Sequence, residues 1–263
     1  YSAGTQVANT RTDFAACRLN NTTCTGLSTL EVRAGNQNLK PENATTLSLG
    51  TVFQPRRNLT LTVDYWSLKE KGVIGIQGAQ NQILFDLLER QSGRTNPNVV
   101  RLAPVGAQVV GDLSFVQDDY FNLGPRKLRG LDFAVNYDLK DTLIGDLNFD
   151  FGASKLIEFQ QEPSAMQAQL IAANAAGKLG TGVTIAQAGS QIKANGNPQW
   201  RMTGNLTWKS GPVSAGVLVS YVGSVFDTGT AQVNGAFYEL PSFTTVNSYL
   251  QFRAGKSDGP LSG

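Results

Sequence analysis

Residues 200–221 read WRMTGNLTWKSGPVSAGVLVSY, and this stretch decides the fold. Apolar and polar residues alternate on both sides of its centre, which predicts two antiparallel strands joined by a tight turn. A two-residue turn at Ser210 and Gly211 puts Trp208 opposite Val213. The large apolar side chains of both strands then share one face, because a slip of one residue would move one strand's apolar set to the polar face.

The same period-two alternation occurs elsewhere in the chain and predicts further strands. These strands cover residues 45–53, 59–66, 130–138, 146–154 and 245–252. With the two strands of the opening stretch they make seven, so the sequence predicts an all-β, antiparallel fold.

The connections between these strands alternate strictly in length. Short turns cover residues 54–58, 140–146 and 209–212, whereas long excursions cover residues 69–126, 156–199 and 223–242. Tight turns on one side and long loops on the other are typical of a transmembrane β-barrel with long extracellular loops. Trp200 and Trp208 bracket one apolar face about 20 Å apart along the membrane normal, which is the spacing of two aromatic girdles.

A soluble β-sandwich is the alternative, because it shows the same alternation of apolar and polar residues. Its outer face would be rich in Lys and Glu, whereas the polar face here consists mostly of Thr, Ser, Asn, Gly and Asp. No charged residue falls on the apolar face of the predicted strands, as hydrocarbon requires. The pattern therefore favours a transmembrane barrel whose polar face lines the lumen.

Composition argues against several classes of function. The chain has 263 residues, with 22 Lys and Arg against 20 Asp and Glu, so there is no basic surplus for nucleic acid. It contains no His, which excludes Ser-His-Asp catalysis and HExxH metal sites within these residues. No run of about 18 apolar residues predicts a membrane helix, and the first residues lack the features of a signal peptide. We expect no enzymatic activity, no metal and no cofactor.

Cys17 and Cys24 are the only cysteines, and the polar stretch RLNNTT separates them. They form either a surface-loop disulfide in an oxidising compartment or two unrelated thiols in a reducing one. Disulfides commonly close short polar loops of this kind, so the disulfide is favoured. We expect it within an extracellular loop formed by residues 1–43.

The long excursions contain helical patterns, a further strand and several aromatic residues. Residues 79–90 place Ile83, Leu84, Leu87 and Leu88 on one stripe, and residues 165–177 are rich in Ala and Gln, so both predict short helices. Residues 109–117 read as a strand that continues into the one at 127–139. The candidate ligand residues are Tyr120, Phe121, Phe237 and Tyr238, whose rings can stack on a sugar or a catechol; the alternative is that they anchor their own loops.

Several motifs follow one another in an order seen in a known family. Residues 35–42, GNQNLKPE, stand directly before the strand at 45–53 and resemble the GNPxLKPE motif of TonB-dependent outer-membrane receptors. Similar segments follow at residues 63–66 with 72–74, at Asn122 with residues 130–132 and Tyr137, at residues 198–201, and at residues 240–243 with Asn247. Gln37 replaces the usual Pro and Asn247 the frequent Asp, both at polar positions that do not threaten the fold.

The resemblance implies a barrel of about 22 strands in the bacterial outer membrane, closed inside by an N-terminal plug. Such receptors import scarce nutrients such as siderophores, cobalamin or oligosaccharides, with energy delivered by the TonB-ExbB-ExbD complex. Barrel strands and loops are expected at residues 44–253, at about strands 14 to 20, and a truncated periplasmic turn at residues 254–263. Two open sheet edges would leave unpaired backbone groups in hydrocarbon, so we expect a longer polypeptide.

The resemblance also places the polar face of the strands against the plug. The candidate contact residues are Asp64, Asp132, Asn136, Asp138, Asp146, Asn148, Asp150, Arg201 and Asn205. We expect them to contact the plug or one another, since water can replace such contacts when the plug is pulled; solvated lumen lining is the alternative. The expected partners are outer-membrane lipid, the plug, the TonB complex and a small nutrient ligand. The alternative function is a non-transporting surface or adhesion module that binds protein or glycan through its loops.

Overall fold

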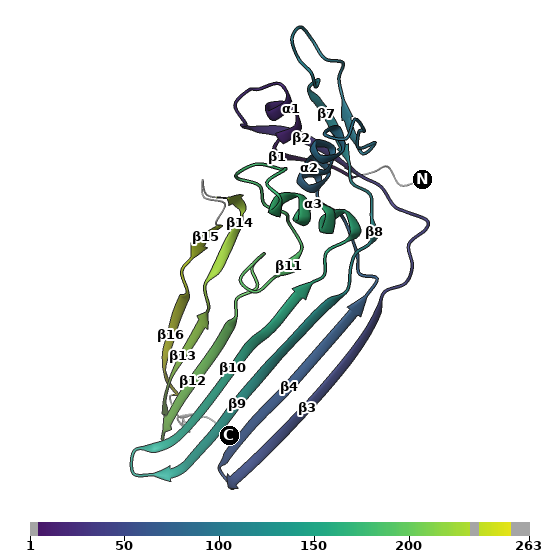
Figure 1. The fold of residues 1–263 in the computed structure, drawn as a ribbon. Coiled ribbons are helices and arrows are strands. Elements are labelled where there is room, and N and C mark those ends of the chain that lie inside the picture. Colours follow the sequence, from purple (N-terminus) through teal and green to yellow (C-terminus); the bar gives the residue numbers. More distant parts are fainter. Residues whose placement is uncertain (1–4, 232–236, 254–263) are drawn as a thin grey trace, which may run out of the picture.

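The computed structural model describes residues 5–231 and 237–253, and its main body is one long antiparallel sheet (Figure 1). Seven strands follow one another across this sheet in the order β16-β13-β12-β10-β9-β4-β3. Their bounds are β3 (Asn43–Arg56), β4 (Leu59–Lys71), β9 (Arg126–Thr142), β10 (Gly145–Gln161), β12 (Trp200–Ser210), β13 (Val213–Val222) and β16 (Phe243–Phe252). The seven predicted strands are therefore confirmed, whereas the turn predicted at 254–263 lies outside the described residues.

The register of the β12–β13 hairpin differs from the predicted one by two residues. Trp208 pairs with Ala215, and the turn consists of Gly211 and Pro212. The predicted pairing of Trp208 with Val213 is wrong, because it would put Pro212, which has no N–H, in the first hydrogen-bonded pair of the ladder. Gly211 takes a φ of 55° in the turn, which glycine adopts without strain. A shift of two residues keeps every side chain on its predicted face.

The pairing aligns two different faces across the sheet. On the apolar face, Leu61 of β4 lies opposite Val135 of β9, which lies opposite Phe151 of β10. On the other face, Asp150 lies between Asn136 and Asn205 on the two neighbouring strands. The alternation read from single strands thus extends from strand to strand as one apolar and one polar surface.

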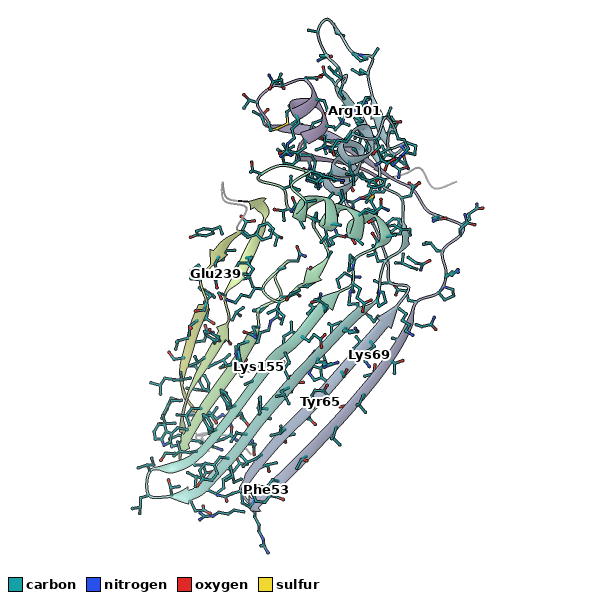
Figure 2. All side chains as sticks on the ribbon, in the orientation of Figure 1. Phe53, Tyr65, Lys69, Arg101, Lys155 and Glu239 are labelled. Carbon is teal, nitrogen blue, oxygen red and sulfur yellow. A yellow bond between two sulfur atoms is a disulfide. The ribbon has the colours of Figure 1, made fainter. Side chains whose placement is uncertain are left out.

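Lys155 lies at the cap-side end of the apolar face. β10 continues beyond the predicted segment 146–154, and its next residue, Lys155, lies opposite Leu131 and Trp200. The Lys155 Nζ atom is 5.0 Å from the centre of the Trp200 ring. Figure 2 shows Phe53 near the short-turn end of the sheet and Lys155 farther toward the other end. The aliphatic stem of Lys155 can therefore lie on the apolar face while its ammonium group reaches the cap-side end of that face.

A second folded unit, which we call the cap, lies at the end of the sheet opposite the short turns (Figure 1). It comprises residues 5–36, 74–123 and 162–187. A four-stranded sheet in the order β1-β2-β7-β6 runs through it. The strands are β1 (Thr5–Thr12), β2 (Gly26–Arg33), β6 (Val99–Arg101) and β7 (Leu113–Gln117), and the helices are α1 (Phe14–Leu19), α2 (Ala79–Arg90) and α3 (Ala165–Ala175).

Smaller elements complete the described chain. In the cap, β5 (Ile74–Gly75) pairs with β8 (Phe121–Asn122). β11 (Gly189–Ser190) pairs with the end of β10, and β14 (Val225–Ala231) pairs with β15 (Phe237–Leu240) as a separate hairpin.

The cap has its own hydrophobic core between its three helices. The buried members are Ala15, Leu84, Leu87, Leu170, Ala173 and Leu179. The helix predicted at 79–90 is confirmed with its stripe, because Ile83, Leu84 and Leu87 are buried and Leu88 packs against them. The second helix is confirmed as α3, which ends two residues earlier than predicted.

The strand predicted at 109–117 forms only from Leu113 onward. It pairs in parallel with β2, so its predicted continuity with the strand at 127–139 is wrong. The reason lies in the two acids that follow it. Asp118 accepts hydrogen bonds from the start of α2, and Asp119 accepts one from the Ala34 N–H, so the chain is held in the cap.

Candidate functional site on the polar face and in the cap

Three side-chain hydrogen bonds bridge β9 and β10 on the polar face. They run from Asn136 to Asp150, from Asn148 to Asp138 at 2.9 Å, and from the Ser154 hydroxyl to Asp132 at 2.6 Å. Each joins residues that lie directly opposite one another in the ladder. The donors are neutral amide and hydroxyl groups. These bonds therefore hold the acids in place without pairing any of them with a cation.

Asp64 and Arg201 lie at opposite ends of one cross-strand row, which runs Asp64, Asp132, Ser154, Arg201. Neither of the two end residues makes a hydrogen bond or an ion pair with the described residues. The same is true of Asn205, one row away. The Asp64 carboxylate lies over Gly50, where any Cβ atom would collide with it. The two ends of the row thus present one acid and one cationic side chain, both without a partner among the described residues, to whatever faces them.

Small residues form a hollow in the middle of the polar face. Ala134 lies opposite Gly152, and the hollow around them has a volume of about 290 Å³. Asp150 and Asn205 line it. A side chain from another element can therefore enter between the polar residues of neighbouring strands.

Asp146 is the second residue of β10 and lies beside the short turn between β9 and β10. It accepts a hydrogen bond of 3.0 Å from the Asp141 N–H, and it lies 3.8 Å from the Lys140 ammonium. Asp141 itself takes a φ of 54°, which Asp tolerates better than most residues. Asp146 therefore stabilises the turn.

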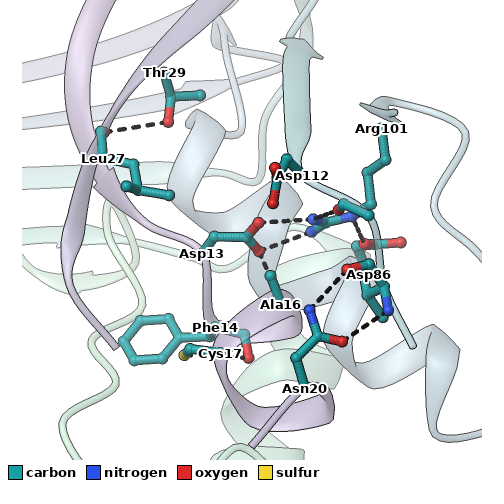
Figure 3. A network of polar contacts seen from close by, with 12 residues as sticks. Asp13, Phe14, Ala16, Cys17, Asn20, Leu27, Thr29, Asp86, Arg101 and Asp112 are labelled. Atoms are coloured by element: carbon teal, nitrogen blue, oxygen red, sulfur yellow. Dashed lines mark hydrogen bonds and ion pairs between the residues drawn. The ribbon is translucent and has the colours of Figure 1, made fainter. Parts of the chain in front are cut away.

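A buried ionic network joins three separate segments of the cap (Figure 3). The Arg101 guanidinium donates two hydrogen bonds to Asp13, of 2.7 and 2.8 Å, and one of 2.9 Å to Asp86. The side chains of these three residues are at most 6% exposed. Burial lowers the pKa of Arg101, but the hydrogen bonds and charges of the two acids outweigh it, so the pKa is raised overall. The network fixes α1, α2 and β6 relative to one another.

Asp118 caps the beginning of α2 from a distant position in the chain. Its carboxylate accepts hydrogen bonds from the backbone N–H groups of Gln77 and Gly78 and from the Gln82 side chain. Burial raises the pKa of Asp118 above its ordinary value, and the charge of Glu31 adds to this, although the hydrogen bonds oppose it. The side chain thus holds Gln77 and Gly78, the two residues directly before α2, and so fixes the chain where the helix begins.

Cys17 and Cys24 are joined by a disulfide, with their Cα atoms 5.1 Å apart. Cys17 lies in α1 and is buried, so the bridge ties the segment after the helix back to the cap. Asn20 accepts hydrogen bonds from the N–H groups of Val109 and Val110, which holds the same segment against the chain before β7.

Two of the four aromatic ligand candidates, Tyr120 and Phe121, lie together in the cap. They line a cavity of about 250 Å³. The other lining residues are Asn36, Gln77, Gln82, Phe85, Asn96, Asn98, Asp119 and Met166. The remaining candidates, Phe237 and Tyr238, lie on β15 and do not line it. Sequence position alone therefore grouped residues that the fold separates.

The family comparison decides what kind of protein these features belong to. The family described as "TonB dependent receptor-like, beta-barrel" matches residues 2–258. The chain belongs to this receptor family. The resemblance read from residues 35–42 and the later motifs is thereby confirmed, and so is the β-barrel fold class.

Solved structures similar to this receptor chain share its fold. The siderophore receptor PirA from Acinetobacter baumannii has a TM-score of 0.51 and 10% identity over 88% of this chain. A mutant of the ferric enterobactin receptor PfeA from Pseudomonas aeruginosa has a TM-score of 0.53 and 14% identity over 95% of this chain. In each case the chain spans 28% of the solved structure's length. A search of curated protein sequences found no match.

The described part of this receptor chain has no group of three or more His, Cys, Asp or Glu residues placed to hold a metal ion. Within the same residues, no helix has the length and hydropathy needed to cross a membrane.

Sequence reasoning missed the polar residues of the receptor's cap. Arg101 and Asp13 are 88 positions apart, and nothing in either local sequence indicates their partner. The amides that line the cavity come from three segments around 36, 77–82 and 96–98. The one available signal was the density of Asn and Gln in the excursion at 69–126, which an extracellular loop also explains.

Proposed function

We propose that this chain forms part of the wall and the outer cap of a TonB-dependent transporter in the bacterial outer membrane, which takes up a scarce nutrient. The observation that carries this proposal is the continuous apolar face across seven strands, with a folded cap at one end only and short turns at the other. A spanning sheet in lipid needs such a face, and a receptor needs an elaborated outer side.

In this arrangement the apolar face contacts lipid and the cap lies outside the cell. Trp200 and Trp208, at the two ends of β12, stand at the two membrane interfaces. Lys155 extends from the outer end of the apolar face beside Trp200, where its ammonium reaches the lipid headgroups.

The polar face surrounds an N-terminal plug supplied by the rest of the polypeptide. Asp64 and Arg201, which have no partner among the described residues, are the first candidates to pair with plug side chains. The hollow beside Asp150 accepts one side chain of the plug. Such contacts hold the plug yet yield when the TonB-ExbB-ExbD complex pulls on it, because water can replace each hydrogen bond.

The nutrient is a siderophore, cobalamin or an oligosaccharide, and the cap and upper wall bind it. Support for this class comes from the solved relatives, which include the ferric enterobactin receptor PfeA in complex with enterobactin. Its TM-score of 0.52 at 14% identity supports a shared fold.

Uptake measurements test the transport proposal. In cells that carry the full receptor, accumulation of the nutrient should stop when TonB is deleted or when a protonophore collapses the proton-motive force. Uptake that survives both treatments contradicts the proposal. Extraction from an outer-membrane fraction only with detergent supports the barrel, whereas a protein that stays in aqueous buffer without detergent favours the surface or adhesion module instead.

A double substitution tests the role of the polar face. Asp132→Asn with Asp150→Asn, in the full receptor, should loosen the plug and admit large antibiotics while leaving ligand affinity at the cell surface nearly unchanged. The matched control is Asp146→Asn, since Asp146 stabilises a turn. Lost affinity with unchanged permeability would instead assign the two wall acids to the binding site.

A further inference from the structure

The cavity beside Tyr120 and Phe121 has a chemical character that differs from an anion site. We call it the amide cavity, because five of its ten lining residues are Asn or Gln. None of these lining residues is Lys or Arg, and the only ionisable acid is Asp119. Sites that bind an anionic ligand through side chains commonly use cationic donors, of which Arg is the most effective. The amide cavity therefore suits a neutral ligand.

Several polar atoms of the amide cavity remain available to a ligand. Asn36 Oδ1 accepts from the Asn38 N–H and Gln77 Oε1 accepts from Ser164, but the side-chain NH₂ groups of Asn36 and Gln77 have no partner among the described residues. Asn98 Oδ1 and the second carboxylate oxygen of Asp119 are free acceptors within the same residues. Donors and acceptors are thus both on offer, and a hydroxyl group, which donates and accepts, can bond to both kinds.

The rest of the polar lining is already fixed by internal bonds. Asn96 donates to the backbone and the side chain of Gln82 at 3.0 and 2.9 Å, and Gln82 donates to Asp118. Both Asn96 and Gln82 are 4% exposed. The back of the cavity is therefore preorganised, which lowers the entropic cost of binding a ligand.

Aromatic side chains supply the apolar part of the amide cavity. Tyr120 is 40% exposed, and Phe121 and Phe85 are partly exposed beside it. Flat rings next to mixed donors and acceptors fit a sugar ring, which has apolar C–H faces and a rim of hydroxyl groups. A volume of about 250 Å³ holds part of a ligand, such as one ring of a longer chain.

We infer that the amide cavity is a subsite for a neutral, hydroxyl-rich ligand, one ring of an oligosaccharide. This inference rests on the proposed transport function and names the substrate class for it. The same lining repels an anionic ferric catecholate, because Asp119 is unopposed by any cation in the cavity.

The first test is direct binding to the full receptor in detergent. A microarray of neutral oligosaccharides should show binding, and titration calorimetry with the best of them should give its Kd. Tyr120→Ala and Asn98→Ala should each weaken that Kd about five- to tenfold, by loss of a stacked ring or of a hydrogen bond. The control is Val105→Ala, an exposed residue of the cap outside the cavity, which should change the Kd less than about twofold.

The outcomes separate this inference from the transport proposal. A silent array, or a Kd unaffected by Tyr120→Ala, overturns the subsite. TonB-dependent uptake of ferric enterobactin that Tyr120→Ala leaves unchanged also overturns it, while transport stands. Oligosaccharide binding that depends on Tyr120, without any energised uptake, keeps the subsite and removes the transport function.

Discussion

The sheet and the cap use the same hydrophobic residues in opposite ways. In the sheet, Leu49 and Leu250 are 72% and 77% exposed, whereas in the cap Leu84 and Leu170 are 0% exposed. The cap thus buries its large side chains within this chain, while the sheet presents them outward. The difference indicates two solvents, because a unit exposed to water must bury its apolar side chains in a core of its own, whereas a wall exposed to lipid need not.

The polar residues of the two regions differ as well. The cap buries charged side chains beside hydrogen-bonding partners, as Arg101 with Asp13 and Asp86 shows. The polar face of the sheet leaves Asp64 and Arg201 without partners among the described residues. A buried charge needs partners within its own unit, whereas a charge on the lumen face can be hydrated by water or paired with another element.

Arg101→Ala should have the largest effect, and it tests whether the cap depends on its ionic network. The substitution leaves Asp13 and Asp86 buried without their shared cation, which should cost about 3–5 kcal/mol of cap stability. Hydrogen exchange of α2 in the full receptor measures this local free energy of unfolding. The control is Arg94→Ala, an exposed pair with Glu89, which should leave exchange unchanged. Equal exchange in both variants contradicts the role of the network.

Leu206→Lys should have the next largest effect, and it tests the outward face of the sheet. A Lys near mid-height on the lipid face should cost about 2–4 kcal/mol, whereas Asn205→Lys on the adjacent lumen position stays hydrated or paired. Assembly of the two variants in outer membranes can be compared by heat-modifiable gel mobility. Equal yields would show that neither face meets lipid, and a lower yield of Asn205→Lys would show that the two faces are assigned the wrong way round.

Removal of the disulfide should have a smaller effect, confined to the cap. Cys17→Ser with Cys24→Ser removes a bridge with a sequence separation of 7, worth about 2.5 kcal/mol by loop-closure entropy. Hydrogen exchange of α1 should rise while the sheet keeps its protection. Thiol labelling of the unreduced, denatured wild-type protein should find neither cysteine, and full labelling of both would refute the bridge.

Asp118→Asn should have the smallest effect, and it tests whether Asp118 makes the stability of the cap depend on pH. The pKa of Asp118 is raised in the folded state, so its protonation stabilises the fold. This contribution to the free energy of unfolding is present in full below the unfolded-state pKa and is lost as pH rises through the folded-state pKa. On acidification from neutral pH, the wild-type cap should therefore gain stability relative to the variant. Hydrogen-exchange protection of the Gln77 and Gly78 amides, which donate to Asp118, measures the difference at several pH values. A wild-type cap that loses stability relative to the variant on acidification contradicts the prediction.

Sequence periodicity was sufficient for the sheet because strand alternation is a local property. Residues 200–221 alone indicated two strands and their faces, and the other five predicted segments showed the same alternation. The register failed by two residues at Pro212, where the missing N–H of a single residue moved the turn. The disulfide was also within reach, since its two cysteines lie close together in the chain.

The cap was decided by tertiary structure. Helix α2 was legible from its stripe, but the parallel pairing of β2 with β7 was not, because residues some 85 positions apart share no local signal. The same holds for Arg101 and Asp13 and for the amides that meet beside Tyr120. The two faces of a strand follow from the alternation of residues in its own sequence, whereas a buried ion pair or a binding cavity exists only once distant segments have packed together.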